Sequence, residues 1–158
     1  MFQFAPLRAE HMAEVVFYEK PGCANNRRQR DLLESSGHML TVHDLLSTPW
    51  QTESLLPFLK GKPIKAWFNR ASPRIKSGEV DPCSLDTNSA LALLISDPLL
   101  IRRPLIQVGN WRAIGFDARE LAFLLSQGLD EPDIVNKVAP EFCHRKDHCP
   151  TPQRKPDP

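Results

Sequence analysis

The sequence predicts a single α/β domain, and three observations lead to that prediction. Short segments rich in β-branched and aromatic residues alternate with segments of good helix formers. Hydrophobic residues make up 41% of the chain and charged residues 25%, which is typical of a globular protein. The length of 158 residues suits one domain that can bury a sizeable core.

The first strand and the first helix are expected on either side of a Pro-Gly turn. The segment EVVFYE, residues 14–19, is rich in β-forming residues, and Pro21 and Gly22 then end the pattern. Residues 24–36 are good helix formers, and Gly37 stands where a glycine often ends a helix. The domain is therefore expected to begin with a strand, a tight turn and a helix.

A second strand and a second helix are expected next. The segment HMLTVHDLL, residues 38–46, contains β-branched residues and predicts a strand. Residues 48–61 are expected to be helical, with Thr48 as the N-cap and Pro49 at the first helical position. Pro57 should bend or divide this helix, because it lacks the N–H group that the helix would use.

The middle of the chain predicts short helical pieces. Residues 62–84 form a broken, polar-rich region that contains several prolines. The segment DTNSALALLISDP then predicts a capped helix that starts at Asp86 or Thr87 and stops at Pro98. These pieces separate the β-α-β unit at the start of the chain from the strands that follow.

The last third of the chain predicts a hairpin and a final helix. The segment LLIRRPLIQVG is expected to be a strand that pairs with NWRAIGF across a turn at Gly109-Asn110. Asp117 is expected to cap a last helix, ARELAFLLSQ, which Gly128 ends. The whole order of elements is that of a thioredoxin-like fold with a helical insertion.

Composition indicates the domain boundaries and argues against some classes of function. We expect an N-terminal extension at 1–13, one domain at 14–128, and a disordered, proline-rich C-terminal tail at 129–158. The net charge of +1 and the balanced basic run at 27–30 do not indicate nucleic-acid binding. The chain lacks an apolar run of about 18 residues and a secretory signal, so we expect a cytoplasmic protein without a membrane partner.

Cys23 is the first candidate for chemistry, because it stands between the first strand and the first helix. A helix N-terminus presents unpaired N–H groups and a positive dipole end, and Arg27 and Arg28 add charge that favours a thiolate. The alternative is an inert buried thiol, since cysteine is often buried. Asn26 occupies the second position of a Cys-x-x-Cys pair, so a redox cycle is monothiol or uses a distant or external thiol.

The second candidate is the Arg103-Pro104 pair before the predicted third strand. In thioredoxin-like folds a proline at this place, usually after a cis bond, faces the active thiol. Arg103 would then direct an always-charged guanidinium toward the same pocket. The alternative is that Arg102 and Arg103 are surface arginines before an edge-strand proline.

A more specific indication comes from four segments taken together: YEKPGCANNRRQRDLLESSG, IKAWFN, LALLISDPLLIRRPLI and WRAIGFD. In their order and spacing they resemble the arsenate-reductase-like family, ArsC with its Spx relatives, over residues 14–127. Within that family the chain is most similar to the branch called nitrogenase-associated proteins. The resemblance implies a thioredoxin-like fold with a helical insertion.

The resemblance also implies site residues and partners. In the arsenate reductases the family cysteine attacks the oxyanion, and glutathione and glutaredoxin resolve the adduct. Cys23 matches that catalytic cysteine. The anion-binding positions fall at Arg27, Asn26 and Arg103, and the structural proline falls at Pro104. No bound cofactor is implied, whereas glutathione is a candidate co-substrate, and glutaredoxin and a nitrogenase-related protein are candidate partners.

Four positions depart from the family's pattern, and the first of them is Asn26, which stands at the serine-like position before the loop arginine. Glu19 stands where the reductases have a histidine, and a nearby carboxylate favours the neutral thiol. Asn69 replaces an arginine of the insertion, with Arg70 beside it on a different face, and Gly115 falls at an arginine of the last strand, with Arg112 nearby. These departures argue against an ordinary arsenate reductase and leave two hypotheses: a monothiol redox protein, or a non-catalytic Spx-like interaction module.

The other cysteines are weaker candidates. Cys83 lies in a predicted loop and is expected to have no role. The tail holds two cysteines and two histidines, which are Cys143, His144, His148 and Cys149. These residue types bind zinc, but their spacing is too tight for a usual zinc finger, so we assign no metal site. A tail thiol that resolves an adduct at Cys23 is the alternative.

Overall fold

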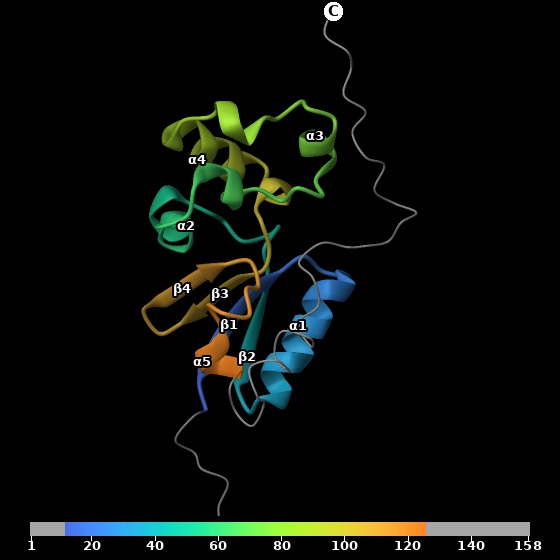
Figure 1. Cartoon of the computed structure of the whole chain (residues 1–158), viewed down its shortest axis with the longest axis vertical. Helices are drawn as coiled ribbons and strands as arrows, with labels where there is room; N and C mark the ends of the chain where they lie inside the picture. The colour runs from blue at the N-terminus through green and yellow to red at the C-terminus, as the bar shows by residue number, and fades with distance from the viewer. Residues whose placement is uncertain (1–11, 126–158) are drawn as a thin grey trace, which may run out of the picture.

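The computed structural model describes residues 12–125. They form a mixed sheet of four strands with helices around it (Figure 1), which confirms the predicted α/β fold with a helical insertion. The strands are β1 (Glu14–Glu19), β2 (Met39–Asp44), β3 (Leu105–Val108) and β4 (Trp111–Ile114), in the order β2-β1-β3-β4. β1 pairs with β2 in parallel and with β3 antiparallel, and β3 pairs with β4 antiparallel. Within residues 12–125 no helix is both long and apolar enough to cross a membrane.

The first β-α-β unit forms as predicted, with helix α1 at Ala24–Ser35. Val15 and Phe17 alternate along β1 on one face of the sheet, and both are buried. Gly22 before the helix and Gly37 after it have φ angles of 79° and 90°, which residues with a side chain rarely adopt. Both ends of α1 are therefore fixed by glycines in the sequence.

Two groups of elements cover the two faces of the sheet (Figure 1). α1 and the short helix α5 (Ala122–Leu125) cover the face to which Phe17 and Ile106 point. The segments between β2 and β3 cover the opposite face, to which Tyr18 and Leu105 point. The core is thus divided into two apolar clusters, one on each side of the sheet.

The insertion between β2 and β3 consists of short pieces, as predicted. They are α2 (Thr52–Leu59), η2 (Ile64–Trp67), α3 (Pro73–Lys76), η3 (Pro82–Ser84), α4 (Thr87–Ser96) and η4 (Pro98–Leu100). α4 has the predicted cap, because the Asp86 carboxylate accepts a hydrogen bond from the Ser89 N–H at 2.7 Å. Pro57 does not divide α2, which ends two residues later, at Leu59.

The predicted start of α2 at Thr48 and Pro49 is wrong, because the helix begins at Thr52. The buried ring of Trp50 donates from Nε1 to the Leu45 carbonyl at 2.9 Å. This contact holds the chain in a turn where the first helical residues were expected. The helix starts after that turn with a capping box.

The strand predicted over residues 99–109 is shorter than expected. Only residues 105–108 join the sheet, because the chain before them is bonded to the insertion instead. The N–H of Arg102 donates to the Trp67 carbonyl at 2.9 Å. The segment before β3 therefore connects the insertion to the sheet.

Two predictions near β3 are confirmed. The hairpin turns at Gly109-Asn110, where Gly109 has a φ angle of 54°. The peptide bond between Arg103 and Pro104 is cis, as expected at this place in a thioredoxin-like fold. Pro104 is buried at the start of β3, which places Arg103 at the border between the sheet and the insertion.

The last helix differs from its predicted extent. The Asp117 carboxylate accepts a hydrogen bond from the Arg119 N–H at 2.8 Å, as expected of a cap. The residues that follow form turns, and the helix α5 begins only at Ala122. Gly128, most of the predicted N-terminal extension and the tail at 129–158 lie outside the described residues.

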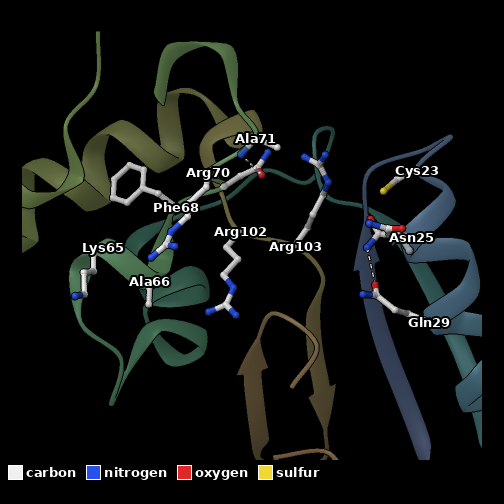
Figure 2. A pocket seen from close by; sticks show the side chains of 12 residues that line it. Cys23, Asn25, Gln29, Lys65, Ala66, Phe68, Arg70, Ala71, Arg102 and Arg103 are labelled. Carbon is white, nitrogen blue, oxygen red and sulfur yellow. Dashed lines mark hydrogen bonds between the residues drawn. The ribbon is translucent and has the colours of Figure 1, made fainter. Parts of the chain in front are cut away.

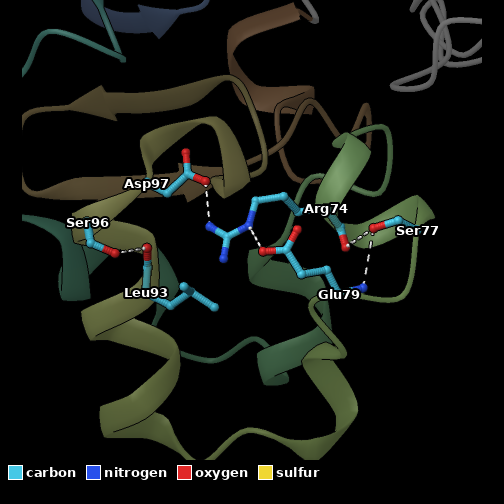
Figure 3. A network of polar contacts seen from close by, with 6 residues as sticks. All are labelled: Arg74, Ser77, Glu79, Leu93, Ser96 and Asp97. Atoms are coloured by element: carbon cyan, nitrogen blue, oxygen red, sulfur yellow. Dashed lines mark hydrogen bonds and ion pairs between the residues drawn. The ribbon is translucent and has the colours of Figure 1, made fainter.

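Polar contacts fix both sides of the domain. In the insertion, Arg74 Nε lies 2.8 Å from a Glu79 oxygen and Nη1 lies 2.8 Å from an Asp97 oxygen (Figure 3), which ties α3 to the end of α4.

On the other side, the buried ring of His38 connects three segments. Its Nδ1 accepts the Ala13 N–H at 3.1 Å, so Nε2 is the donor to the Leu124 carbonyl at 2.5 Å. One side chain therefore joins three segments: the residue before β1, the turn before β2, and helix α5.

Candidate functional site

Cys23 occupies the N-cap position of α1, directly after the Pro-Gly turn. Its N–H donates to the Lys20 carbonyl at 3.1 Å, and its carbonyl accepts the Arg27 N–H at 3.1 Å, so the backbone is held on both sides. Its side chain makes no capping hydrogen bond. The half-buried thiol therefore lies at the positive end of the helix dipole.

A cavity of about 280 Å³ opens beside this thiol. It is enclosed by the start of α1, by the stretch from η2 to the loop before α3, and by the residues just before β3. Its cationic lining residues are Lys65, Arg70, Arg102 and Arg103. None of the described residues that line it is acidic, so the cavity favours an anion.

The cations are not evenly placed around the cavity. In Figure 2, Arg103 extends on the side of the opening that faces Cys23. Arg70 and Arg102 point to the other side, where Lys65 also lies. The cavity therefore has a reactive end at the thiol and a far end with three cations.

The structure brings two of the three predicted anion-binding residues to this cavity. Asn26 and Arg103 line it together with Cys23. Arg27 is exposed and lines a separate depression on the other side of Cys23, which it shares with Glu19. The thiol thus stands between two recesses, each with an arginine.

Asn26 is buried, and both ends of its amide are hydrogen-bonded. Its Oδ1 accepts the Lys20 N–H at 3.2 Å, and its Nδ2 donates to Gln29 Oε1 at 2.9 Å. These bonds hold the turn that presents Cys23. Gln29 also lines the cavity and was not among the predicted site residues. A signal for it exists, because Asn26, Gln29 and Leu33 share the buried stripe of α1 at helical spacing.

Glu19, at the family's histidine position, has a cationic neighbour of its own. Its Oε2 lies 2.9 Å from Arg30 Nε, and its side chain is 13% exposed. Burial raises the pKa of Glu19, while the nearby Arg30 lowers it and Asp44 raises it. Arg30 therefore offsets much of the negative charge that Glu19 would otherwise direct at Cys23.

The structure also places Asn69 and the two arginines, Arg70 and Arg112, that lie near the other positions that depart from the family's pattern. Asn69 shapes its loop, since its Oδ1 accepts the Ala71 N–H at 3.1 Å. Arg70 lines the cavity although a different face was expected, because the chain turns there and does not continue as a helix. Arg112 lies with its guanidinium carbon 5.8 Å from the centre of the Phe58 ring, away from the cavity lining.

Sequence patterns did not identify two further cavity residues, Lys65 and Arg102, as site residues. Both come from segments that the insertion folds back toward α1, and neither stands at an element boundary that marks function. The IKAWFN segment, which contains Lys65, was noted only for its resemblance to the family.

The remaining cysteines are not part of the cavity as far as the structure describes them. Cys83 is exposed in η3 and does not line the cavity. The sequence had predicted no role for it. Four tail residues lie outside the described residues: Cys143, His144, His148 and Cys149. The expectation that they form no metal site and the alternative of a resolving tail thiol therefore stay predictions.

Comparison with known proteins identifies the family. Residues 18–123 match the model of the ArsC family. A protein of Rhodospirillum rubrum, described as an uncharacterized 15.7 kDa protein in the draG 3′ region, is 53% identical over 106 residues, which cover 67% of this chain and 74% of that protein. The global transcriptional regulator Spx of Streptococcus agalactiae is 26% identical over 122 residues, which cover 76% of this chain and 89% of the regulator.

Solved structures agree on the fold. The crystal structure of a putative ArsC family related protein from Bacteroides fragilis has a TM-score of 0.62 at 22% sequence identity. The match covers 70% of this chain and 96% of that one. Fold, family model and sequence relatives lead to one conclusion: the chain belongs to the ArsC family.

Proposed function

We propose that the chain is a monothiol redox protein of the ArsC family in which Cys23 is the nucleophile. One observation carries the proposal: the Cys23 thiol lies at the N-terminus of α1 and opens on a cavity lined by cations, with Arg103 on the same side (Figure 2). A positive environment of this kind stabilises a thiolate and attracts an anionic partner. A cytoplasmic location fits a chain that works through free thiols.

The proposed reaction is thiol–disulfide exchange. The Cys23 thiolate attacks one sulfur of a disulfide, a new bond joins the two sulfurs, and the second sulfur of the disulfide leaves as a thiolate. A small thiol such as glutathione, alone or through glutaredoxin, then attacks the mixed disulfide. That step forms a new disulfide and returns Cys23 as a thiolate, so the electrons balance without a bound cofactor.

Each predicted site residue has a part in this reaction. Arg103 holds an anionic group of the reactant on the cavity side of Cys23, and Arg27 does so from the depression on the other side. Asn26 acts as a positioning residue, since its amide holds the turn before α1. Pro104 fixes the backbone that carries Arg103.

A second candidate function is a non-catalytic regulatory module. The observation that favours it is the match to streptococcal proteins named as global transcriptional regulators, which extends over most of both chains. Arsenate reduction ranks behind both candidates, because the insertion has Asn69 and the last strand has Gly115 where that activity is expected to need arginines. By resemblance to the nitrogenase-associated branch, the protein partner is a nitrogenase-related protein in either case.

The alkylation rate of Cys23 tests the redox proposal. Two variants of the full chain keep a single thiol, Cys23 or Cys83, with every other cysteine replaced by serine. Cys83 is exposed and Cys23 is half-buried, so accessibility alone predicts that Cys83 reacts faster with iodoacetamide. We expect the opposite order at pH 7, with Cys23 faster by about tenfold, because under the proposal the helix N-terminus and the nearby cations activate Cys23 as the nucleophile.

The outcome separates the two candidate functions. A Cys23 rate equal to or below that of Cys83 contradicts the redox proposal. A pull-down from a lysate with wild type and with Cys23→Ser then tests the regulatory module, which should retain its partner without the thiol. Loss of the partner in Cys23→Ser would count against a purely non-catalytic role.

A further inference from the structure

We propose that the outer edge of β2 is an interaction surface for a second copy of this chain, and that the two β2 strands pair with each other in antiparallel orientation. The described lining of the cavity and of the depression beside Cys23 includes no residue of β2. The inference therefore goes beyond the proposed function and does not depend on the chemistry of the thiol. Backbone hydrogen bonds at the sheet edge, the side chains of β2 and the charges of α1 support it.

β2 is the first strand in the order of the sheet, and within the described residues no strand lies on its outer side. The N–H of Met39 donates to the Ala13 carbonyl at 3.0 Å, and the N–H of Leu45 donates to the Glu19 carbonyl at 2.8 Å. Backbone groups alternate in direction along a strand, so the odd-numbered residues of β2 direct their N–H and C=O groups toward β1. The even-numbered residues therefore direct theirs toward the outer edge.

This outer edge is closed at both ends and open in the middle. Before the strand, the N–H of His38 donates back to a carbonyl of α1 at 3.3 Å. At its end, the Asp44 carbonyl accepts the Thr48 N–H at 3.1 Å and the Thr48 hydroxyl at 2.7 Å. Between these points, the outward N–H and C=O groups of Leu40 and Val42 have no hydrogen-bond partner in the described part of the chain. Unpaired groups of this kind are a template for another strand.

The open groups set the register of an antiparallel pair. When Leu40 lies opposite Val42 of the second copy, and Val42 opposite Leu40, every open N–H group meets an open C=O group. A shift by two residues would need the Asp44 carbonyl or the His38 N–H, which are already bonded within the chain. In the favoured register the two-fold axis passes beside Thr41, which lies opposite the same residue of the second copy.

The side chains of β2 fit a paired strand better than a solvent-exposed one. Residues 39–43 include no lysine, arginine, acid or proline, which are the residues that commonly keep an edge strand from pairing. Five large apolar side chains are exposed in the described chain, and two of them, Met39 at 56% and Val42 at 38%, lie on this one strand. In the favoured register Val42 packs against Leu40 of the second copy, and no like charges lie opposite each other.

The charges of α1 favour a second copy over an unrelated strand. α1 contacts β2 and runs along it at this edge of the sheet (Figure 1). The exposed cations Arg27 and Arg28 lie near the start of α1, whereas the exposed acids Asp31 and Glu34 lie nearer its end. The two-fold axis directs the two helices in opposite senses, so the basic start of each lies on the side of the acidic end of the other. The edge is therefore complementary to itself in charge as well as in hydrogen bonding.

The first test is analytical ultracentrifugation of the full chain under reducing conditions. We expect a reversible dimer with a dissociation constant of about 10–100 μM, because pairing at one edge buries a small area. Thr41→Lys and Thr41→Glu should each weaken this dimer about tenfold, since like charges then lie opposite each other at the two-fold axis. An equal mixture of the two variants should recover the dimer, because opposite charges meet. Thr87→Lys, at an exposed threonine of α4, is the control and should leave the dimer unchanged.

Disulfide trapping locates the contact. The starting chain has its 4 cysteines replaced by serine, and Thr41→Cys is introduced into it. Opposite residues of an antiparallel pair have Cβ atoms about 4.5–5.5 Å apart, so mild oxidation should join two copies through this position. Thr87→Cys in the same background is exposed to the same degree of collision and should form the covalent dimer at least about tenfold more slowly.

Each other outcome overturns the inference. A chain that stays monomeric up to about 1 mM has no self-pairing edge, whether the edge remains open or another segment covers it. A dimer that Thr41→Lys leaves unchanged, that the mixture of charged variants does not recover, or that Thr41→Cys does not trap is formed by another surface. The proposal for Cys23 is unaffected by any of these results, because no described residue of β2 lines the cavity or the depression beside the thiol.

Discussion

The two faces of the sheet are stabilised in different ways. The face covered by the insertion has the larger apolar cluster, and its charged contacts, such as those of Arg74, lie near the surface. The face covered by α1 and α5 has a smaller apolar cluster, but it contains three of the four buried polar residues of the described chain. Those three are Asn26, Gln29 and His38.

This difference matches what each side contributes to the cavity. Apolar packing fills volume but tolerates exchange of side chains, whereas hydrogen bonds between buried groups fix the positions of particular atoms. The α1 side presents Cys23, the nucleophile of the proposed reaction, whose sulfur would have to meet a reactant at a defined place. The insertion presents long cationic side chains such as Lys65, which act over a longer range. The thiol side therefore depends on directional contacts, and the charged side depends on packing.

Leu94→Ala should cause the largest loss of stability. Leu94 is fully buried in α4, in the apolar cluster of the insertion, and its truncation should lower the free energy of unfolding by about 2–5 kcal/mol. Urea unfolding measures the loss. The control is Leu99→Ala, at a residue that is 43% exposed, where we expect less than about 1 kcal/mol. Equal losses would contradict the view that packing holds the insertion.

His38→Leu should have a smaller effect, and it tests the polar contacts of the other face. The variant removes the partner of the Ala13 N–H and of the Leu124 carbonyl, so the free energy of unfolding should fall by roughly 1–3 kcal/mol. His43→Leu is the matched control, because that ring is exposed and only stacks on Tyr18. A loss in the control as large as that in His38→Leu would show that the buried contacts do not stabilise this face.

The elements that could be predicted from the sequence are those whose signals are local. Gly22 and Gly37 limit α1, and Asp86 caps α4, so each boundary is set within a few residues. The start of α2 and the length of β3 could not be predicted, because contacts between segments decide them. The Trp50 ring displaces the start of α2, and the N–H of Arg102 bonds to the insertion and not to a neighbouring strand.

The residues of the candidate site also divide into those that local signals predict and those that contacts between segments decide. Cys23 and Arg103 stand at a helix start and before a strand proline, so their places follow from the order of elements. Gln29 and Lys65 line one cavity only because the insertion folds back toward α1, and no local pattern carries that information. Arg27 follows Asn26 directly and is turned about 100° around the helix from it, which explains why it lines the other recess.

Asn26→Asp tests whether the chain of amide hydrogen bonds stabilises the α1 side. The aspartate still accepts the Lys20 N–H but presents a second acceptor to Gln29, whose amide must rotate to donate to it. The free energy of unfolding should fall by ~1 kcal/mol, which urea unfolding measures. Asn25→Asp is the control, because it adds the same charge at the neighbouring position of the cavity lining. An equal loss in that control would mean that the added charge alone, and not the chain of amides, lowers the stability.

Glu19→Gln should give the smallest effect, and it shows how the α1 side tolerates a buried carboxyl. Burial raises the pKa of Glu19 above its ordinary value, although Arg30 opposes this shift. A raised pKa means that the folded protein favours the protonated form, so this contribution to stability is present at acidic pH. It is lost as the pH rises through the folded-state pKa.

Glutamine resembles the protonated carboxyl and does not titrate, so the variant should become more stable relative to wild type as the pH rises from 4 to 7. Urea unfolding at both pH values measures this change, and the constant cost of leaving Arg30 without its partner cancels in the difference. Glu34→Gln, at an exposed residue of helix α1, should show a smaller change. A gain for Glu19→Gln at acidic pH instead would mean that the attraction of Arg30 outweighs burial. In that case the carboxyl beside Cys23 belongs to a stabilising ion pair, and the two faces of the sheet differ less than their buried polar residues suggest.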